Sequence, residues 1–280
     1  MHYVLTLSCP DRPGIVRALA EGVVAVGGNI VESAQFSDPV TGTFCMRTHF
    51  EAEVEDVESV RAAVVARLAP FEPVVSLRPM EVRRRALIMV SRFDHCLVDL
   101  LYRWQIGELP VEIAVVVSNH EDCREVVERA GLRFVHLPVT PGTKAEAEAG
   151  LLGLVEEHGV DFVVLARYMQ VLSDDLCRRL SGRVINIHHS FLPGFKGARP
   201  YHQAFERGVK LIGATAHFVT ADLDEGPIIE QDVQRHEHNH DSAKMARMGK
   251  NIETLVLARA VYWHCQRRII LDGSRTVIFK

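Results

Sequence analysis

The chain has 280 residues, 48% of them hydrophobic and 24% charged, which is enough to bury a large core and to form two domains. Its formal charge of -4 gives no positive field for a phosphate backbone, so nucleic acid is excluded as an expected partner. The six cysteines lack paired zinc spacing, and no apolar run approaches the roughly 20 residues of a membrane span. We therefore expect a cytoplasmic protein with reduced thiols and no membrane partner.

Residues 1–80 follow the order strand, helix, strand, strand, helix, strand, which is typical of a ferredoxin-like unit. Asp11 can cap the first helix, Pro13 can start it, and Gly27-Gly28 ends it. The second helix carries valines and a leucine on one face between Val57 and Leu68. Period-two patterns predict strands over 3–9, 29–37, 44–50 and 74–78.

A charged linker is expected over 81–85, and a second domain over 86–280. Its β-branched runs alternate with amphipathic helices, which favours a Rossmann-like, mostly parallel sheet covered on both faces. The predicted parallel strands are 86–91, 111–118, 133–137, 160–166 and 183–188. Two longer strands after residue 210 extend the sheet as an antiparallel pair, and a long helix covers about 241–268. The fold class is therefore α/β, with a smaller ferredoxin-like domain in front.

The strand over 183–188 ends in an unusual concentration of polar groups, Asn186, His188 and His189. In parallel sheets, ligands bind beyond the carboxyl ends of the strands, so this position favours an active site over a surface loop. Period-two alternation puts Asn186 and His188 on one face of the strand and turns His189 away from it. We expect one functional histidine and one structural neighbour.

A second polar cluster is the acidic turn TADLDEGPII, residues 220–229, in which Gly226 can take a positive φ and Pro227 restricts the exit. Asp224 becomes a candidate if it meets His188 in space, because a carboxylate orients an imidazole and favours its charged form. Asn186, His188 and Asp224 together would suit attack on an acyl carbon without a metal or a covalent intermediate.

Two other kinds of site are disfavoured. SRFDHCL, residues 91–97, follows the first strand of the second domain and contains no glycine, so a Rossmann nucleotide fingerprint and a P-loop are both absent. HEHNH, residues 236–240, places three histidines at alternate positions, but an extended polar connection explains them as well as a metal site does. We expect no metal and no cofactor.

Two long segments of the second domain resemble the formyltransferase-type catalytic domain. They are NIHHSFLPGFKGARPYHQAFERG (186–208) and IGATAHFVTADLDEGPIIEQ (212–231). Within that superfamily, the HHSFLP variant and ARYMQVLS (166–173) are similar to formyltetrahydrofolate deformylases. The resemblance implies Asn186, His188 and Asp224 as the catalytic residues. It further implies a folate-binding segment and supporting positions at Met169, Gln170, Val171, Leu172, Thr215 and His217.

Two departures from the transformylases of this superfamily concern the acceptor. The glycine-rich phosphate loop is missing after the first strand, and Gln170 stands where those enzymes usually carry Arg. Without the glycines, backbone amides cannot approach a ribonucleotide phosphate closely. The resemblance thus implies hydrolysis of 10-formyltetrahydrofolate to tetrahydrofolate and formate, which balances one-carbon folate pools for purine biosynthesis. Formyl transfer to an amine and a non-catalytic folate or amino-acid sensor are the alternatives.

The N-terminal unit resembles an ACT domain, a ferredoxin-like module that binds small amino acids and often pairs across a dimer. The similar segments are CPDRPGIV (9–16) and GGNIVES (27–33). The resemblance implies an amino-acid effector site at Asp11, Gly14, Asn29 and Ile30, although helix capping and turn formation explain Asp11 and Gly14 equally well. It also implies a homodimer or homotetramer.

Overall fold

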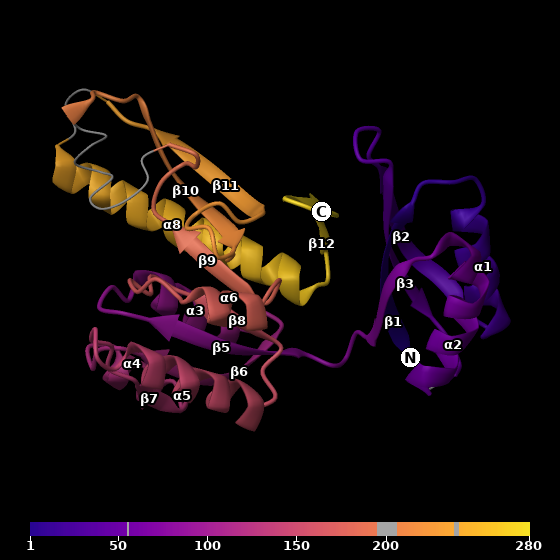
Figure 1. The fold of residues 1–280 in the computed structure, drawn as a ribbon, viewed down its shortest axis with the longest axis horizontal. Coiled ribbons are helices and arrows are strands. Elements are labelled where there is room, and N and C mark those ends of the chain that lie inside the picture. Colours follow the sequence, from indigo (N-terminus) through magenta and orange to yellow (C-terminus); the bar gives the residue numbers. More distant parts are fainter. Residues whose placement is uncertain (55, 195–205, 238–240) are drawn as a thin grey trace. The chain divides into compact units, whose positions relative to one another are not determined.

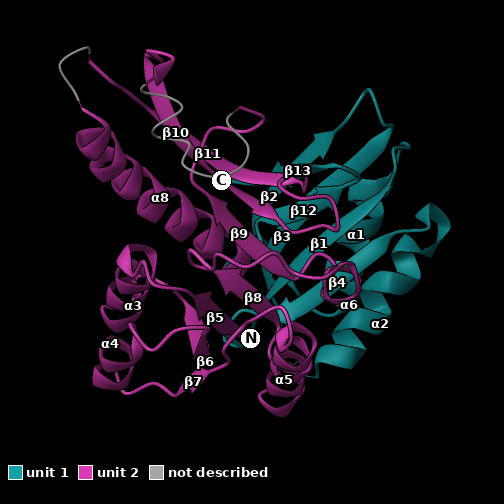
Figure 2. Cartoon of the chain, turned by 60° about the vertical axis from the view of Figure 1, so that its left-hand side comes forward, with its two compact units in different colours: residues 1–83, 266–280 teal, residues 84–265 magenta. Residues whose placement is uncertain are grey.

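The computed structural model describes residues 1–54, 56–194, 206–237 and 241–280. The chain forms two compact units, one of residues 1–83 with 266–280 and one of residues 84–265 (Figure 2). Within the described ranges, no helix is both long enough and apolar enough to cross a membrane.

The first unit contains the predicted ferredoxin-like arrangement. Its four-stranded sheet has the order β2-β3-β1-β4, and every neighbouring pair is antiparallel. The elements are β1 (His2–Pro10), α1 (Ile15–Ala25), β2 (Asn29–Ser37), β3 (Thr43–Glu51), α2 (Val57–Leu68), a 3₁₀ turn (Ala69–Phe71) and β4 (Val74–Pro79).

One face of this sheet is covered by α1 and α2. Alternate residues of β1, among them Leu5 and Leu7, pack with Leu19 of α1 and Val64 of α2 in one buried cluster. Gly22 permits the close approach of the two helices, because a Cβ there would lie 2.9 Å from the Val64 Cα. The hydrophobic stripes of both helices therefore have the partner that the sequence pattern predicts.

The opposite face is covered by the C-terminal hairpin of β12 (Ile269–Asp272) and β13 (Arg275–Ile278). Ile270 and Phe279 pack with Cys45 of β3. The Arg47 side chain is only 2% exposed, where its guanidinium donates to the Gln266 carbonyl oxygen and pairs with Glu32 at 3.2 Å. The hairpin thus buries the second face of β3, whose middle residues are buried on both sides.

The domain boundary at the C-terminal end differs from the sequence expectation. The second domain was predicted to continue to residue 280, and its last helix to about 268. Instead, α8 (Ser242–Cys265) ends the second unit, and residues 266–280 belong to the first. The physical reason is the outer face of β3, where Cys45 and Arg47 need a cover that the first 83 residues do not supply.

The second unit is built on a seven-stranded sheet of order β11-β10-β9-β8-β5-β6-β7 (Figure 1). Its five strands from β9 to β7 are parallel, and β10 and β11 extend it antiparallel, as predicted. The elements before α8 are β5 (Arg84–Val90), α3 (His95–Gln105), β6 (Val111–Ser118), α4 (Arg124–Arg129), β7 (Phe134–His136), α5 (Lys144–Glu157), β8 (Phe162–Leu165), α6 (Asp174–Arg179), β9 (Val184–His188), β10 (Leu211–Phe218) and β11 (Ile228–Arg235).

The sheet positions the candidate site. The buried runs of β5, β6 and β8 pack against α5 and α6 through Leu87, Val115, Leu151, Val163 and Leu176. Along another part of the unit, α8 contacts β9, β10, β11 and α3 (Figure 1). Because β9, β8 and β5 are parallel neighbours, their carboxyl ends lie at the same edge. The residues that follow these three strands therefore gather there.

The C-terminal hairpin should contribute measurably to the stability of the first unit. Phe279→Ala removes a large side chain from the small cluster around Cys45, so we expect a loss of about 3 kcal/mol in the free energy of unfolding. Urea unfolding measures this loss. The matched control is Val40→Ala, at a side chain that is 84% exposed, which should change little. Equal effects of the two substitutions would show that the hairpin does not cover β3 in solution.

Candidate active site

Asn186 and His188 lie at the carboxyl end of β9, and the antiparallel strand β10 pairs with them. Asn186 pairs with His217, and His188 pairs with Thr215. Directly paired residues share a face of the sheet, so the side chains of all four lie on one side. The structure thereby brings both predicted strand-end residues to a common face, next to the two supporting positions on β10.

His217 fixes the orientation of the Asn186 amide. The Nδ1 of His217 donates to the Phe218 carbonyl oxygen at 2.8 Å, so a neutral ring carries its lone pair on Nε2. That nitrogen accepts a hydrogen bond from Asn186 Nδ2 at 3.1 Å. Burial lowers the pKa of His217 and keeps the ring neutral. The amide of Asn186 therefore points in a defined direction, and its second N–H can donate to a ligand.

His188 and Asp224 form the central contact. The imidazole Nδ1 lies 3.3 Å from Asp224 Oδ1, and both side chains are largely buried, with 6% and 11% exposed. The hydrogen bond from His188 is the largest influence on the carboxyl group and lowers the pKa of Asp224, which stays ionised. Asn186, His188 and Asp224, separated in the chain, therefore converge on one small region around His217.

Ser190 is a site residue that the sequence reasoning missed. Its hydroxyl donates to the Gly194 carbonyl oxygen at 2.8 Å and lies 2.9 Å from Nε2 of His188. The two ring nitrogens of His188 thus contact Asp224 and Ser190, which fixes the orientation of the imidazole. The position two residues after His188 in the HHS motif was the available signal.

Thr215 holds the loop that follows β9. Its side chain is completely buried, donates to the Ser190 carbonyl oxygen at 2.9 Å, and accepts from the Leu192 backbone N–H at 3.1 Å. The Gln231 amide donates to the same hydroxyl at 2.9 Å. Thr215 was grouped with the substrate-binding positions, and the structure gives it contacts to the protein's own loop.

The turn that carries Asp224 depends on a glycine, although not in the predicted way. Gly226 does not have a positive φ; Asp224 itself is the left-handed residue, at φ 59°. A Cβ on Gly226 would lie 1.7 Å from the Phe218 carbonyl oxygen. The glycine thus lets the turn approach the end of β10 and bring Asp224 over His188. A left-handed non-glycine residue at this point is strained, as is common at functional sites.

The predicted folate segment follows β8 at the same sheet edge. Met169 and Val171 are 51% and 57% exposed, Gln170 is half-buried, and Leu172 is buried. The backbone N–H of Met169 donates to the Ser91 hydroxyl at 2.9 Å, which fixes the start of the segment. Together with Tyr168, residues 170–172 line a hollow. Adjacent exposed apolar side chains of this kind suit the face of a flat aromatic ligand.

His189 lies outside this arrangement. Its ring centroid is 5.1 Å from that of His188. Burial, reinforced by the charges of Arg167 and His188, lowers the pKa of His189 to about 4. The ring is therefore neutral at physiological pH. Of the HEHNH segment, residues 238–240 lie outside the described residues, and His236 is buried.

The four predicted effector residues do not form one group within a single chain. Asp11 follows Pro10, which pairs with Thr43 at the start of β3. Asn29 pairs with Glu51 at the opposite end of β3. Asp11, Gly14, Asn29 and Ile30 are all exposed. Gly14 has φ 103° at the start of α1, a conformation that favours glycine.

Comparison with known proteins agrees with this architecture. Residues 84–261 match the family described as Formyl transferase. Formyltetrahydrofolate deformylase from Corynebacterium sp. (strain P-1) is 46% identical over 100% of this chain and 99% of its own length. The relative of that name from Bacillus subtilis (strain 168) is 47% identical over 98% of this chain and 93% of its own.

Solved structures give the same result. The formyltetrahydrofolate deformylase from Burkholderia mallei aligns with a TM-score of 0.95 at 47% identity, over 100% of this chain and 99% of its own. Glycinamide ribonucleotide transformylase 1 from Symbiobacterium toebii aligns over 71% of this chain and 95% of its own, with a TM-score of 0.67 at 30% identity. The chain belongs to the formyltetrahydrofolate deformylase family.

Proposed function

We propose that this chain hydrolyses 10-formyltetrahydrofolate to tetrahydrofolate and formate. The observation that carries the proposal is the convergence of an oriented amide donor, an imidazole and an ionised carboxylate at the end of β9. Relatives that match the whole chain bear the name of this reaction. The formate and the released folate would serve one-carbon metabolism, including purine biosynthesis. The folate is the substrate, and we propose no additional cofactor.

The proposed mechanism assigns a role to each of the three groups. Asn186 donates its second amide N–H to the formyl oxygen, and His188 in its charged form stabilises the oxyanion that develops there. Asp224 holds His188 and deprotonates or positions the attacking water. The water oxygen bonds to the formyl carbon, the bond from this carbon to N10 breaks, and a proton passes to N10. His188 is buried, and the lower local dielectric strengthens these electrostatic interactions.

The folate ring would lie against residues 169–172. Met169 and Val171 offer apolar surface, and the backbone of the segment offers hydrogen-bonding groups next to the half-buried Gln170. The turn with Asp224 would form the other wall. Thr215 and His217 would support this pocket indirectly, through the loop after β9 and through Asn186.

We also infer a homodimer with an amino-acid effector, supported by the edge of the first sheet. β2 ends the strand order of that sheet and exposes Val31 and Phe36. Two copies paired antiparallel along β2 would place Asn29 of one copy near Ser37 of the other. Ser37 donates to the Asp11 carboxylate, so such a dimer would join residues that a single chain keeps apart. A homotetramer would contain the same contact.

The role of Asp224 is tested by Asp224→Asn. Losing the ionised carboxylate should lower kcat by about 10²–10⁴-fold, while the dissociation constant for folate stays nearly unchanged. Steady-state kinetics and fluorescence titration measure the two effects. Asp222→Asn is the matched control, because Asp222 lies in the same turn and is exposed. An Asp224→Asn enzyme with near-normal turnover would contradict the assignment.

Hydrolysis is distinguished from transfer by omitting any amine. Purified protein with 10-formyltetrahydrofolate in an amine-free buffer should release formate and tetrahydrofolate in equal amounts, because water is the acceptor. Formate dehydrogenase coupling and absorbance of the folate give the two yields. Dependence on an added amine would establish a transferase, and binding without turnover would establish a sensor.

The stabilising effect of Asp224 should depend on pH. The hydrogen bond from His188 holds the folded-state pKa of Asp224 below its ordinary value of 3.8. The contact therefore stabilises the fold above that value, and the stabilisation is lost as pH falls through the folded-state pKa. The difference in urea midpoint between wild type and Asp224→Asn should shrink from about pH 6 to about pH 3. A difference that stays constant would show that the contact does not perturb the carboxyl group.

A further inference from the structure

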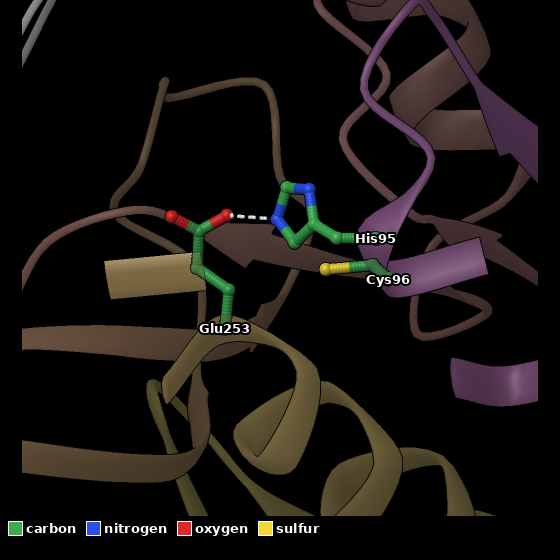
Figure 3. Close-up of side chains that lie close together, drawn as sticks. All are labelled: His95, Cys96 and Glu253. Atoms are coloured by element: carbon green, nitrogen blue, oxygen red, sulfur yellow. Dashed lines mark hydrogen bonds and ion pairs between the residues drawn. The ribbon is translucent and has the colours of Figure 1, made fainter. Parts of the chain in front are cut away.

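A second buried polar cluster lies in the catalytic unit, apart from Asn186, His188 and Asp224. Glu253 of α8 is 1% exposed, and its Oε2 accepts a hydrogen bond from Nε2 of His95, at the start of α3, at 2.8 Å (Figure 3). The Nε of Arg167, which follows β8, is 3.3 Å from the same oxygen. The Arg167 guanidinium lies over the Phe93 ring, 5.7 Å from its centroid. The proposed mechanism uses none of these groups.

A metal ion is one possible use of the cluster, since donor atoms of His95, Cys96 and Glu253 lie within 4.8 Å of one another. Two observations weigh against it. The Arg167 guanidinium already places a positive charge beside the Glu253 carboxylate. Burial, reinforced by that carboxylate, raises the pKa of the Cys96 thiol well above its usual value, which disfavours the thiolate that would bind a metal. The groups therefore suit a buried cluster in which Glu253 has His95 and Arg167 as partners.

The cluster borders the reacting groups through the order of the strands. Asn186 pairs with Leu165, the last residue of β8. Arg167 lies in the segment that follows β8, two residues after Leu165, and His188 ends β9, two residues after Asn186. The Phe93–His95 segment follows β5, the next strand along the sheet. The cluster therefore lies beside the β9 strand end, on the side away from β10 and Asp224.

His189 lies near members of both groups. Its ring centroid is 5.1 Å from that of His188, and the charges of Arg167 and Glu253 as well as those of His188 and Asp224 act on its imidazole. Burial keeps the His189 ring neutral. We call the cluster of His95, Arg167 and Glu253 the wall beside the β9 strand end. Its side chains are largely buried, with 14% of His95, 10% of Arg167 and 1% of Glu253 exposed.

Opening this wall is costly. A nucleophile larger than water that approached from the β5 side would have to separate Glu253 from His95 or from Arg167. Separating Glu253 from Arg167 takes a buried carboxylate away from a positive charge, and separating it from His95 breaks a buried hydrogen bond, so both are unfavourable. The segment after β5 also lacks glycine, so its backbone cannot come closer to a ligand in place of the side chains. Water needs no such opening.

We propose that His95, Arg167 and Glu253 are specificity-determining residues that exclude primary amines from the formyl group. The proposal rests on the proposed hydrolysis and names the structural reason why water is its acceptor. Weakening the cluster should permit a second reaction. In that reaction an amine nitrogen bonds to the formyl carbon, the carbon–N10 bond breaks, and the proton lost by the amine passes to N10.

The test measures how the formyl group divides between two products. Wild type and His95→Ala are incubated with 10-formyltetrahydrofolate and glycinamide, a small primary amine, and formylglycinamide and formate are quantified by mass spectrometry. We expect the ratio of formylglycinamide to formate to rise by at least about tenfold in His95→Ala. This ratio does not depend on the fraction of folded enzyme, so a loss of stability cannot imitate the effect.

Three further variants make the result decisive. His95→Gln keeps a side-chain donor for Glu253 and should restore the wild-type ratio of formylglycinamide to formate. His158→Ala changes the histidine at the C-terminal cap of α5 and should leave this ratio unchanged. Phe93→Ala, at a side chain that is 48% exposed, loosens Arg167 without burying a charge and should raise the ratio if His95→Ala does not fold.

An unchanged ratio in both His95→Ala and Phe93→Ala would overturn the proposal. Loss of both products in folded His95→Ala, judged by circular dichroism, would also overturn it, because His95 would then act in the reaction itself. A wild-type protein that releases no formate in the absence of glycinamide would instead refute the proposed hydrolysis. The two failures are therefore distinguishable.

Discussion

The contact between the His188 imidazole and the Asp224 carboxylate is the interaction on which the account depends. The two residues come from different strand ends and meet at 3.3 Å in a largely buried position. Neither group would have a defined role alone, because the imidazole needs a fixed orientation and the carboxylate needs a donor to stay ionised when partly buried. Much of the surrounding structure can be understood as holding this pair in place.

Support comes from both strands. Thr215 ties the loop after β9 to β10, so Ser190 can lie beside Nε2 of His188. Gly226 lets the turn after β10 approach the strand, which carries Asp224 over the histidine. His217, neutral through burial, aims the Asn186 amide at the same region. Hydrogen bonds to the protein's own backbone therefore preorganise the site.

Local patterns predicted the parts of the fold that local physics determines. Period-two alternation predicted that Asn186 shares a face with His188, and continuous apolar runs predicted the parallel sheet. The C-terminal hairpin was missed because its partner is the outer face of β3, more than two hundred residues earlier in the chain. Likewise, the pair of His95 and Glu253 spans 158 residues, and no spacing rule connects them. The meeting of Asp224 with His188 could be expected only from resemblance.

A double-mutant cycle on kcat tests most directly whether His188 and Asp224 act as one unit. The account predicts that the double variant His188→Ala/Asp224→Asn loses less activity than the product of the two single losses. In His188→Ala the carboxylate has already lost one of its functions, which is to orient the imidazole. Losses that multiply, so that the double variant is slower than His188→Ala by the full factor seen for Asp224→Asn, would contradict it.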